Sequence, residues 1–353
     1  MLNLIKNLSG EYEFYVFSLN HEYNRPQERL DVTSNEWLDF QNSAKVFYVS
    51  KEKINFFFIK KIIEGINPDF IYLNGLYNTY FIFYPIIIAK QKGTKVILAP
   101  RGLLQKGTLK LKSFKKKMYL SLFKTLYLQK NVRWHAIDIR EIKDIKEVFG
   151  KDVEIVRAED TPDLSFNDWE VKDKMPKELK MVSISLITAK KNINYTLELL
   201  SQIYIPITFD IYGPVISQSY WELCKKTIEK LPSNIKVNYF GPVNPALVSK
   251  TLEKYHVFIF PTLGENFGHV IYEALRIGLP VIISDKTPWD YVSARNAGFV
   301  IPLEDPEKYI STIEELYEMN DKEYNIISRN ASKIIEEFID NSNYKNEYYH
   351  LFN

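Results

Sequence analysis

The chain has 353 residues, 46% of them hydrophobic, which is enough for two domains with separate cores. Its formal net charge of +2 gives no global reason to expect a nucleic acid or a membrane as partner, so either would need a local patch. Cys224 is the only cysteine, which excludes an intrachain disulfide and favours a reducing compartment.

The first half of the chain alternates short apolar strands with longer amphipathic segments. Residues 1–10 are too polar for a signal peptide, so we expect a cytoplasmic protein. The apolar stretch 70–90 is interrupted by Asn74, Gly75 and Pro85, which favours a strand, a loop and a helix over a membrane span. Strands are predicted near 12–19, 46–49, 70–73, 95–99, 132–135 and 153–156. This alternation predicts a parallel, doubly wound sheet.

A basic segment follows the fourth of these strands. Pro100, Arg101 and Gly102 come directly after the strand. Apolar residues then interleave with a set of lysines, namely Lys106, Lys110, Lys112, Lys115, Lys116 and Lys117. Such a stretch suits an anionic membrane surface or a lipid diphosphate acceptor. A solvated helix face explains the pattern equally well.

A histidine closes the fifth predicted strand. His135 is followed by Ala136, Ile137 and Asp138, and Glu141 lies six residues after it. Taken without context, a lone histidine at a strand end favours a structural role.

The composition changes after residue 158. Residues 159–180 are rich in Asp, Pro, Glu and Lys without clear periodicity, which predicts a linker. The alternation then resumes, with strands near 181–185, 208–212, 236–240, 257–260, 281–284 and 299–301. Two helices joined near 340–342 are predicted over 321–352. The predicted organisation is a first domain (1–158), a linker (159–180), a second domain (181–335) and a terminal helix (336–353).

Two lysines, Lys190 and Lys191, follow the first strand of the second domain and open a helix. Cationic charge at this point could neutralise a diphosphate leaving group. A solvated first helical turn is the alternative. Ligands in such sheets bind beyond the carboxyl ends of the strands, where Gly213, Gly241 and the loop 262–268 are expected.

The stretch 258–290 places two carboxylates around a turn between a strand and a helix. Pro261 stops the strand, and the helix runs from about residue 269 to Gly278. Glu265 therefore lies in the loop and Glu273 on the helix. A carboxylate can accept both vicinal hydroxyls of a ribose, and the amides of a helix N-terminus suit a phosphate or a sugar oxygen. Two acids at this spacing are also common by chance on a solvated helix.

This segment resembles the donor-site motif of retaining glycosyltransferases of family 4, in which Glu, seven residues and Glu follow a strand that ends in Pro-Ser/Thr. The shared positions are Pro261, Thr262, Glu265, Phe267, Gly268, Glu273, Ala274, Gly278, Pro280 and Val281. The resemblance implies a GT-B fold, with two doubly wound Rossmann-like domains that face a cleft. The first domain would be the acceptor side, the second would bind the nucleotide sugar, and the last helix would return to the first domain.

The resemblance also implies roles for individual residues. Glu273 would hold the donor ribose, Glu265 and the amides of Asn266, Phe267 and Gly268 the sugar, and Lys191, helped by Lys190 and with Gly213 nearby, the diphosphate. His135 resembles the family's histidine that points toward the sugar. We therefore predict Glu265, Lys191 and His135 as catalytic. Arg101 and Gly102 resemble a Pro-Arg-Gly-Met/Leu segment and are acceptor-side candidates.

The chain departs from the family pattern at three places. Leu186 occupies the usual arginine position, and Ile137 replaces the usual threonine. The chain also begins inside the expected first helix, so the first strand and its Gly-Gly loop are expected to be missing. These departures favour a degenerate GT-B protein that binds a nucleotide sugar or a partner without catalysis. A GT-B sugar-nucleotide epimerase is a third, weaker alternative.

The leading prediction is a transferase that moves a hexosyl unit from a nucleotide diphosphate sugar to a surface polysaccharide or lipid-linked oligosaccharide. We expect no metal and no cofactor, because the five histidines show no zinc spacing and no Asp-x-Asp tripeptide occurs. Nucleic acid is not an expected partner. A peripheral membrane contact through Lys106 to Lys117 is a further expectation.

Overall fold

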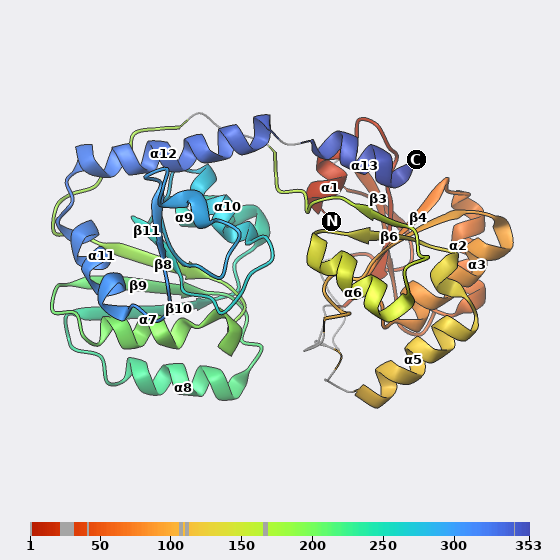
Figure 1. The fold of residues 1–353 in the computed structure, drawn as a ribbon, viewed down its shortest axis with the longest axis horizontal. Helices are drawn as coiled ribbons and strands as arrows, with labels where there is room; N and C mark the ends of the chain where they lie inside the picture. Colours follow the sequence, from red (N-terminus) through yellow and green to blue (C-terminus); the bar gives the residue numbers. More distant parts are fainter. Residues whose placement is uncertain are drawn as a thin grey trace. The chain divides into compact units, whose positions relative to one another are not determined.

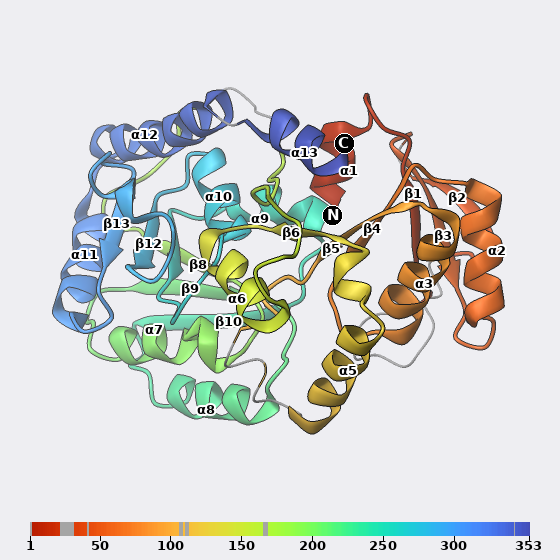
Figure 2. The same cartoon turned by 45° about the vertical axis from the view of Figure 1, so that its right-hand side comes forward.

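A computed structural model of the chain describes residues 2–21, 32–40, 42–105, 109, 113–164, 169–341 and 343–353. The chain divides into two compact units. Unit 1 comprises Met1–Leu164 and Asn343–Asn353, and unit 2 comprises Ser165–Ser342. Figures 1 and 2 show their elements. Lys106, Lys110 and Lys112 of the predicted basic segment lie outside the described residues.

Unit 1 contains two sheets in its described part. One has the order β1-β3-β2 and the other the order β4-β5-β6-β7. The strands are β1 (Tyr15–Leu19), β2 (Trp37–Phe40), β3 (Ala44–Val49), β4 (Phe70–Asn74), β5 (Lys95–Ala99), β6 (Arg133–Ala136) and β7 (Ile155–Arg157). The helices are α1 (Leu2–Leu8), α2 (Phe56–Ile66), η1 (Thr79–Phe83), α3 (Tyr84–Lys92), α5 (Ser113–Thr125), η2 (Leu128–Lys130), α6 (Ile139–Phe149) and α13 (Tyr344–Phe352).

Helices cover both faces of the β4–β7 sheet. Apolar side chains of α3, α5 and α6 pack on the face that carries Leu98 and Trp134. Leu4 and Leu8 of α1 and Phe352 of α13 pack on the opposite face. This alternation follows from the strand period of two, which sends neighbouring side chains to opposite faces. Unit 1 is therefore built as a doubly wound sheet, and α13, at the far end of the chain, is part of it (Figure 2).

The predicted strands of unit 1 are confirmed, but β2 was not predicted. It pairs antiparallel with β3, whereas the other described pairings of this unit are parallel. Its four residues, Trp37–Phe40, are too short for the apolar pattern to stand out from a loop. The strands at the ends of the two sheets, β1, β2, β4 and β7, each pair with one neighbour only among the described strands.

Unit 2 is built around a six-stranded, fully parallel sheet with the order β10-β9-β8-β11-β12-β13. Its strands are β8 (Lys180–Ile184), β9 (Ile207–Tyr212), β10 (Ile235–Gly241), β11 (Val257–Phe260), β12 (Val281–Ser284) and β13 (Gly298–Ile301). Its helices are η3 (Ala189–Lys191), α7 (Ile193–Leu200), α8 (Gln218–Ile228), η4 (Pro245–Leu247), α9 (Val248–Leu252), α10 (His269–Arg276), η5 (Asp290–Val292), α11 (Pro306–Glu318) and α12 (Asp321–Asp340). All six predicted strands of this unit are confirmed.

The two faces of this sheet have separate cores. Val257 and Ile259 of β11 face the cluster formed with α7, α8 and α11, whereas Phe258 and Phe260 face α9, α10 and part of α12. All four side chains are at most 1% exposed. A strand buried on both faces explains why the sequence shows a continuous apolar run here instead of an alternation.

The predicted linker 159–180 is divided between the units, because residues 159–164 belong to unit 1 and residues 169–180 pack in unit 2. Trp169 donates from Nε1 to Ser328 Oγ at 3.0 Å, and Lys172 N donates to Asn325 Oδ1 at 2.7 Å. Lys174 is 1% exposed, and its Nζ donates to the carbonyl oxygens of Met175 and Met319 at 2.7 and 3.3 Å. These bonds satisfy a buried ammonium group beside the C-terminal end of α11, so residues 169–175 are held by α11 and α12.

No helix among the described residues combines the length and the apolar composition needed to span a membrane. The apolar stretch 70–90 forms β4, a loop, η1 and most of α3, as predicted.

Gly213 lies where the chain leaves β9, with φ at +133°. A Cβ atom added there would lie 1.7 Å from the carbonyl oxygen of Ser185, on the loop after β8. Neither backbone can move easily, because Gly213 N donates to Gly241 O at 2.7 Å and Ser185 N donates to Tyr212 O at 3.0 Å. Only glycine allows the two loops to approach so closely.

We expect Gly213→Ala to lower the free energy of unfolding by about 3 kcal/mol or more, since both the steric clash and the backbone angle oppose the substitution. Chemical denaturation measures this change. Gly65→Ala is the control, because nothing lies within 4 Å of its added Cβ and it sits in α2. That variant should gain about 0.5 kcal/mol from helix propensity. Equal stability of the two variants would contradict the account of Gly213.

Candidate functional site

The loop after β11 is shaped by Pro261 and Gly268. Pro261 ends the strand, and Gly268 precedes α10 with φ at +79°. A Cβ on Gly268 would lie 2.9 Å from Ile271 Cδ1 and 3.2 Å from Glu265 Cγ. The chain can therefore enter α10 over the Glu265 side chain only with glycine at this position. The amide groups of the first turn of α10 form the positive end of the helix, next to this loop.

Lys191 and Glu265 form an ion pair across two loops, although 74 residues separate them in the sequence. β8 and β11 are neighbours in the parallel sheet, so the loops that follow them meet at the same edge. Backbone contacts hold the loops together, because Leu263 N and Thr262 Oγ1 both donate to the carbonyl oxygen of Lys190, at 2.9 and 3.1 Å. The structure thus brings together the two segments that the sequence analysis selected separately.

The ion pair is largely shielded from solvent. The side chains of Lys191 and Glu265 are 17% and 18% exposed, and Lys191 Nζ lies 5.1 Å from the centre of the Phe260 ring. The second carboxylate oxygen of Glu265 accepts from the amide of Asn266 at 3.1 Å. A carboxylate has about four lone-pair sites, so these two contacts leave it able to accept further hydrogen bonds.

The other predicted donor-site residues also lie in unit 2. Glu273 lies on α10 and is partly buried, whereas Asn266 and Lys190 are exposed. The carbonyl oxygen of Phe267 accepts from Trp289 Nε1 at 2.5 Å, and the two rings meet edge to face. Trp289 is 2% exposed and belongs to the core of unit 2, so its hydrogen bond holds the loop against that core.

Leu186, at the place where the resemblance expects arginine, is 49% exposed. It follows β8 in the same loop as Ser185. Gly213 and Gly241 lie at the carboxyl ends of β9 and β10, next to this loop in the sheet order. Phe240 and Leu263, at the carboxyl ends of β10 and β11, are also exposed, so this end of the sheet presents apolar as well as charged side chains.

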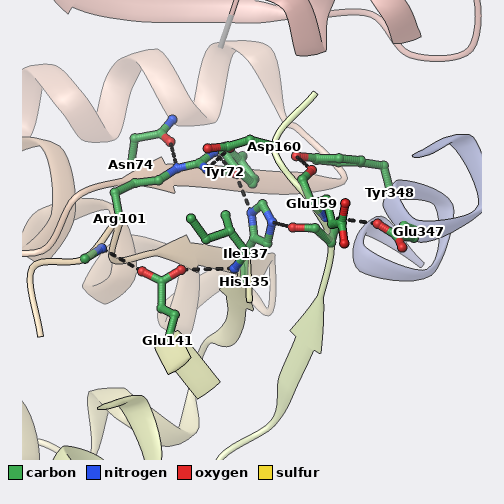
Figure 3. A network of polar contacts seen from close by, with 12 residues as sticks. Tyr72, Asn74, Arg101, His135, Ile137, Glu141, Glu159, Asp160, Glu347 and Tyr348 are labelled. Atoms are coloured by element: carbon green, nitrogen blue, oxygen red, sulfur yellow. Dashed lines mark hydrogen bonds and ion pairs between the residues drawn. The ribbon is translucent and has the colours of Figure 1, made fainter. Parts of the chain in front are cut away.

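A second polar network occupies unit 1, and His135 lies at its centre (Figure 3). The imidazole is 0% exposed. Its Nδ1 lies 2.6 Å from the hydroxyl of Tyr72, and its Nε2 lies 2.8 Å from the carbonyl oxygen of Ala158. Because a carbonyl can only accept, Nε2 carries the proton, and the Tyr72 hydroxyl donates to Nδ1. Both ring nitrogens are thus engaged within unit 1.

Arg101 closes this network from the loop after β5. Its backbone has φ at +54°, a left-handed angle that is uncommon outside glycine. The guanidinium pairs with Asp160, donates to the Tyr72 hydroxyl at 3.0 Å and donates to Asn74 Oδ1 at 3.3 Å. Burial raises the pKa of Tyr72 to about 12, so this hydroxyl keeps the proton that it donates to His135.

Glu141 fixes the neighbouring backbone. Its carboxylate accepts from Gly102 N at 2.7 Å and from Ile137 N at 3.0 Å, which joins the loop after β5 to the loop after β6 (Figure 3). Burial raises the pKa of Glu141, and these two amide bonds oppose that shift. Asp160 was not predicted as a site residue, because it lies in the predicted linker. Its position just beyond the end of β7 is the only signal that could have indicated it.

Two groups therefore emerge, one in each unit. Lys191, Glu265 and the start of α10 form the first, and Arg101, Gly102 and His135 belong to the second. Among the described residues, no three His, Cys, Asp or Glu side chains form a cluster that could hold a metal ion.

Burial, followed by the charge of Arg101, lowers the pKa of His135 to about 4. A lowered pKa in the folded state means that this residue stabilises the fold above its ordinary pKa of about 6.5 and loses that contribution as the pH falls toward 4. We expect wild type to lose up to about 3 kcal/mol of stability from this residue over that range.

The measurement compares wild type with His135→Gln by chemical denaturation between pH 7 and pH 4. The advantage of wild type should shrink as the pH falls, whereas a pH-independent difference would contradict a buried neutral imidazole. His256, whose pKa is also lowered to about 4, chiefly by burial, is present in both proteins and so cancels in the comparison.

The chain is similar to known proteins in both sequence and structure. Residues 166–334 match the family model described as "Glycosyl transferases group 1". The GtfA subunit of the UDP-N-acetylglucosamine–peptide N-acetylglucosaminyltransferase of Streptococcus agalactiae is 25% identical over 136 residues, which cover 37% of this chain and 26% of that protein. The chain therefore spans about a quarter of the length of this curated relative.

Solved structures resemble the chain over most of its length. HepE of Anabaena in complex with UDP-glucose superposes with a TM-score of 0.62 at 14% identity, covering 87% of this chain and 85% of that one. WaaG, a glycosyltransferase involved in lipopolysaccharide biosynthesis, superposes with a TM-score of 0.60 at 13% identity, covering 97% and 91%. At such low identity the likeness shows the fold. The chain therefore has the GT-B fold of two Rossmann-like units, and the match to the group 1 glycosyl transferase model lies within its second unit.

Proposed function

We propose that this chain is a retaining, metal-independent glycosyltransferase that moves a hexosyl unit from a nucleotide diphosphate sugar to a surface polysaccharide or lipid-linked oligosaccharide. The observation that carries the proposal is the Lys191–Glu265 pair at the carboxyl ends of β8 and β11, beside the N-terminus of α10. A cation, a carboxylate and a helix N-terminus are the groups that a diphosphate and a sugar require.

Lys191 is suited to the leaving diphosphate. Negative charge grows on the diphosphate as the glycosidic bond to the donor breaks, and a cation already held in place stabilises that charge without reorganisation. Glu265 positions the ammonium group before the donor arrives. The partly shielded position of the pair strengthens its electrostatic effect relative to a fully exposed one.

In this proposal, Glu265 and Glu273 bind different parts of the donor. Glu265 and the amides of Asn266, Phe267 and Gly268 contact the sugar, while Glu273 on α10 accepts the ribose hydroxyls. Lys190, exposed at the same edge, adds charge near the diphosphate. The chemistry needs a placed acceptor hydroxyl more than a strong protein base.

The contacts of the unit 1 network support a positioning role for His135 and Arg101. Both nitrogens of His135 are engaged by Tyr72 and Ala158, and the guanidinium of Arg101 is paired with Asp160. These bonds hold the loop that contains Arg101 and Gly102, the acceptor-side candidates. Direct contact of His135 with the sugar stays a prediction.

The names of similar proteins suggest which donors to test first. HepE was solved with UDP-glucose, and the name of the curated relative contains UDP-N-acetylglucosamine. WaaG is involved in lipopolysaccharide biosynthesis, which supports a surface-polysaccharide acceptor. UDP-glucose and UDP-N-acetylglucosamine are therefore the first donors to test.

A second candidate is a GT-B protein that binds a nucleotide sugar without transferring it. The exposed Leu186 favours it, because an apolar side chain at this edge contributes no charge to a leaving diphosphate. The two candidates differ in turnover. Tight donor binding without release of nucleoside diphosphate, with or without saccharide acceptors, would favour the binding protein.

Glu273→Gln should weaken binding of the nucleotide sugar by about tenfold to a hundredfold, since a hydrogen bond to a charged group contributes about 1.5 to 3 kcal/mol. Isothermal titration against UDP-glucose and UDP-N-acetylglucosamine measures the effect. Glu314→Gln, an exposed change on α11, is the matched control and should bind as wild type. An unchanged donor affinity in Glu273→Gln would remove the proposed role.

Lys191→Gln should lower kcat by about a hundredfold while changing donor affinity much less, because the charge that Lys191 stabilises is largest in the transition state. Release of nucleoside diphosphate under saturating donor measures kcat. Lys230→Gln, at an exposed position after α8, removes the same charge elsewhere in unit 2 and should leave kcat unchanged. Similar rates for the two variants would exclude a leaving-group role.

A further inference from the structure

The segment after β7 is held by α13, the last helix of the chain (Figure 3). The N–H of Glu159 donates to Glu347 Oε2 at 2.9 Å, and its carbonyl oxygen accepts from the hydroxyl of Tyr348 at 3.1 Å. Tyr348 is 1% exposed, and its ring meets that of His135 edge to face, with 5.6 Å between the ring centres. Side chains of α13 therefore satisfy both main-chain polar groups of Glu159.

The helix has further attachments to unit 1. Leu351 and Phe352 are buried, and the Phe352 ring stacks on that of Phe70 at 4.5 Å. At the C-terminal end of α13, Arg133 Nη1 donates to the carbonyl oxygen of Leu351 at 3.0 Å, where a cation also suits the helix dipole. α13 is therefore a fixed support for Glu159.

Asp160, the residue after Glu159, pairs with Arg101 of the loop after β5. We call residues 100–105 the acceptor-side loop. Arg101 has φ at +54°, which is unfavourable for a residue with a Cβ atom, so its surroundings must hold it there. The two side chains of the ion pair are 26% and 25% exposed, so solvent screens this pair less than an exposed one. The conformation of the acceptor-side loop therefore depends on where the main chain places Asp160.

Other elements hold the chain on either side of residues 159–160. On one side, Ala158 N donates to the carbonyl oxygen of Ala136 at 3.1 Å. On the other side, Asn7 Nδ2 donates to the carbonyl oxygen of Pro162 at 2.8 Å. Loss of the bonds from α13 should therefore loosen residues 159–160 and leave the rest of the segment in place.

We propose that Glu347 and Tyr348 are positioning residues for the acceptor-side loop. They fix the main chain of Glu159, which in turn places Asp160 on the guanidinium of Arg101. The loop is thereby ordered before an acceptor binds, which lowers the entropic cost of orienting the acceptor. The inference rests on the proposed function for the acceptor-side role of the loop, whereas the order of the loop can be measured without any ligand.

The experiment is hydrogen–deuterium exchange of the full chain without ligand, followed in peptides that cover residues 100–105. The amides of Gly102 and Leu103 are hydrogen-bonded there, so the loop is protected in the wild type. Glu347→Ala/Tyr348→Phe should raise the exchange rate of these peptides about tenfold, the effect of losing one or two hydrogen bonds. Wild-type exchange in this double variant would overturn the proposal.

Asp160→Ala tests whether α13 acts through Asp160. By itself this substitution should also raise the exchange rate of the acceptor-side loop about tenfold, because it removes the ion pair with Arg101. Combined with Glu347→Ala/Tyr348→Phe, it should add little, since both changes release the same contact. Independent effects would multiply to about a hundredfold and would contradict a path through Asp160.

Two further variants separate positioning from general loosening of α13. Glu347→Gln should exchange more slowly than Glu347→Ala, because the amide oxygen of Gln can still accept from Glu159 N. Arg133→Gln is the matched control, since it removes a bond to the other end of α13 and leaves both bonds to Glu159 in place. It should lower the melting temperature without raising exchange in the acceptor-side loop. An equal rise in Arg133→Gln and in the double variant would assign the effect to loosening of the helix.

Donor binding distinguishes this inference from the proposed function. Affinity for UDP-glucose, measured by isothermal titration, should be the same in wild type and in every variant, because no substituted residue belongs to the donor site. Absence of donor binding in all proteins would count against the proposed function, while loop exchange would still decide the positioning role. Loss of donor binding in the α13 variants alone would overturn the acceptor-side role of the loop.

Discussion

The parallel pairing of β8 with β11 is the constraint on which the candidate site depends. It places the loop with Lys190 and Lys191 beside the loop with Glu265, and main-chain bonds to the carbonyl oxygen of Lys190 keep the two together. Gly268 then turns the chain into α10 so that the helix N-terminus lies next to the carboxylate. The loops after β8 and β11 and the positive end of α10 therefore meet at the carboxyl ends of the strands. This is where parallel sheets bind ligands.

In unit 1, a loop at the carboxyl end of a strand is fixed mainly by side-chain contacts instead of by strand pairing. There the loop after β5 is held by polar side chains, with Arg101 in a left-handed conformation, Asp160 and Tyr72 on its guanidinium and the buried Glu141 on the amide of Gly102. The neutral His135 completes the network beneath it. A satisfied buried network of this kind rigidifies its surroundings, and removing one member leaves the others unpaired.

Much of the fold was predictable because parallel strands buried on both faces appear as short apolar runs, as in 257–260 and 281–284. β2 was missed because its four residues carry no such signal. The ion pair between Lys191 and Glu265 depends on β8 and β11 being neighbours in the sheet. The periodicity of the sequence predicts strands but not their order in the sheet. The burial of His135 was also beyond prediction, since it depends on Tyr72, Ala158 and the helices packed on that face.

The most direct test of the account is hydrogen–deuterium exchange of the whole chain with and without a nucleotide sugar, beginning with UDP-glucose. The proposed donor site predicts slower exchange in the peptides that cover 185–192 and 262–273, because bound diphosphate and sugar would engage their amides. Slower exchange confined to other parts of unit 2, with these peptides unchanged under saturating ligand, would contradict a donor site at the Lys191–Glu265 pair.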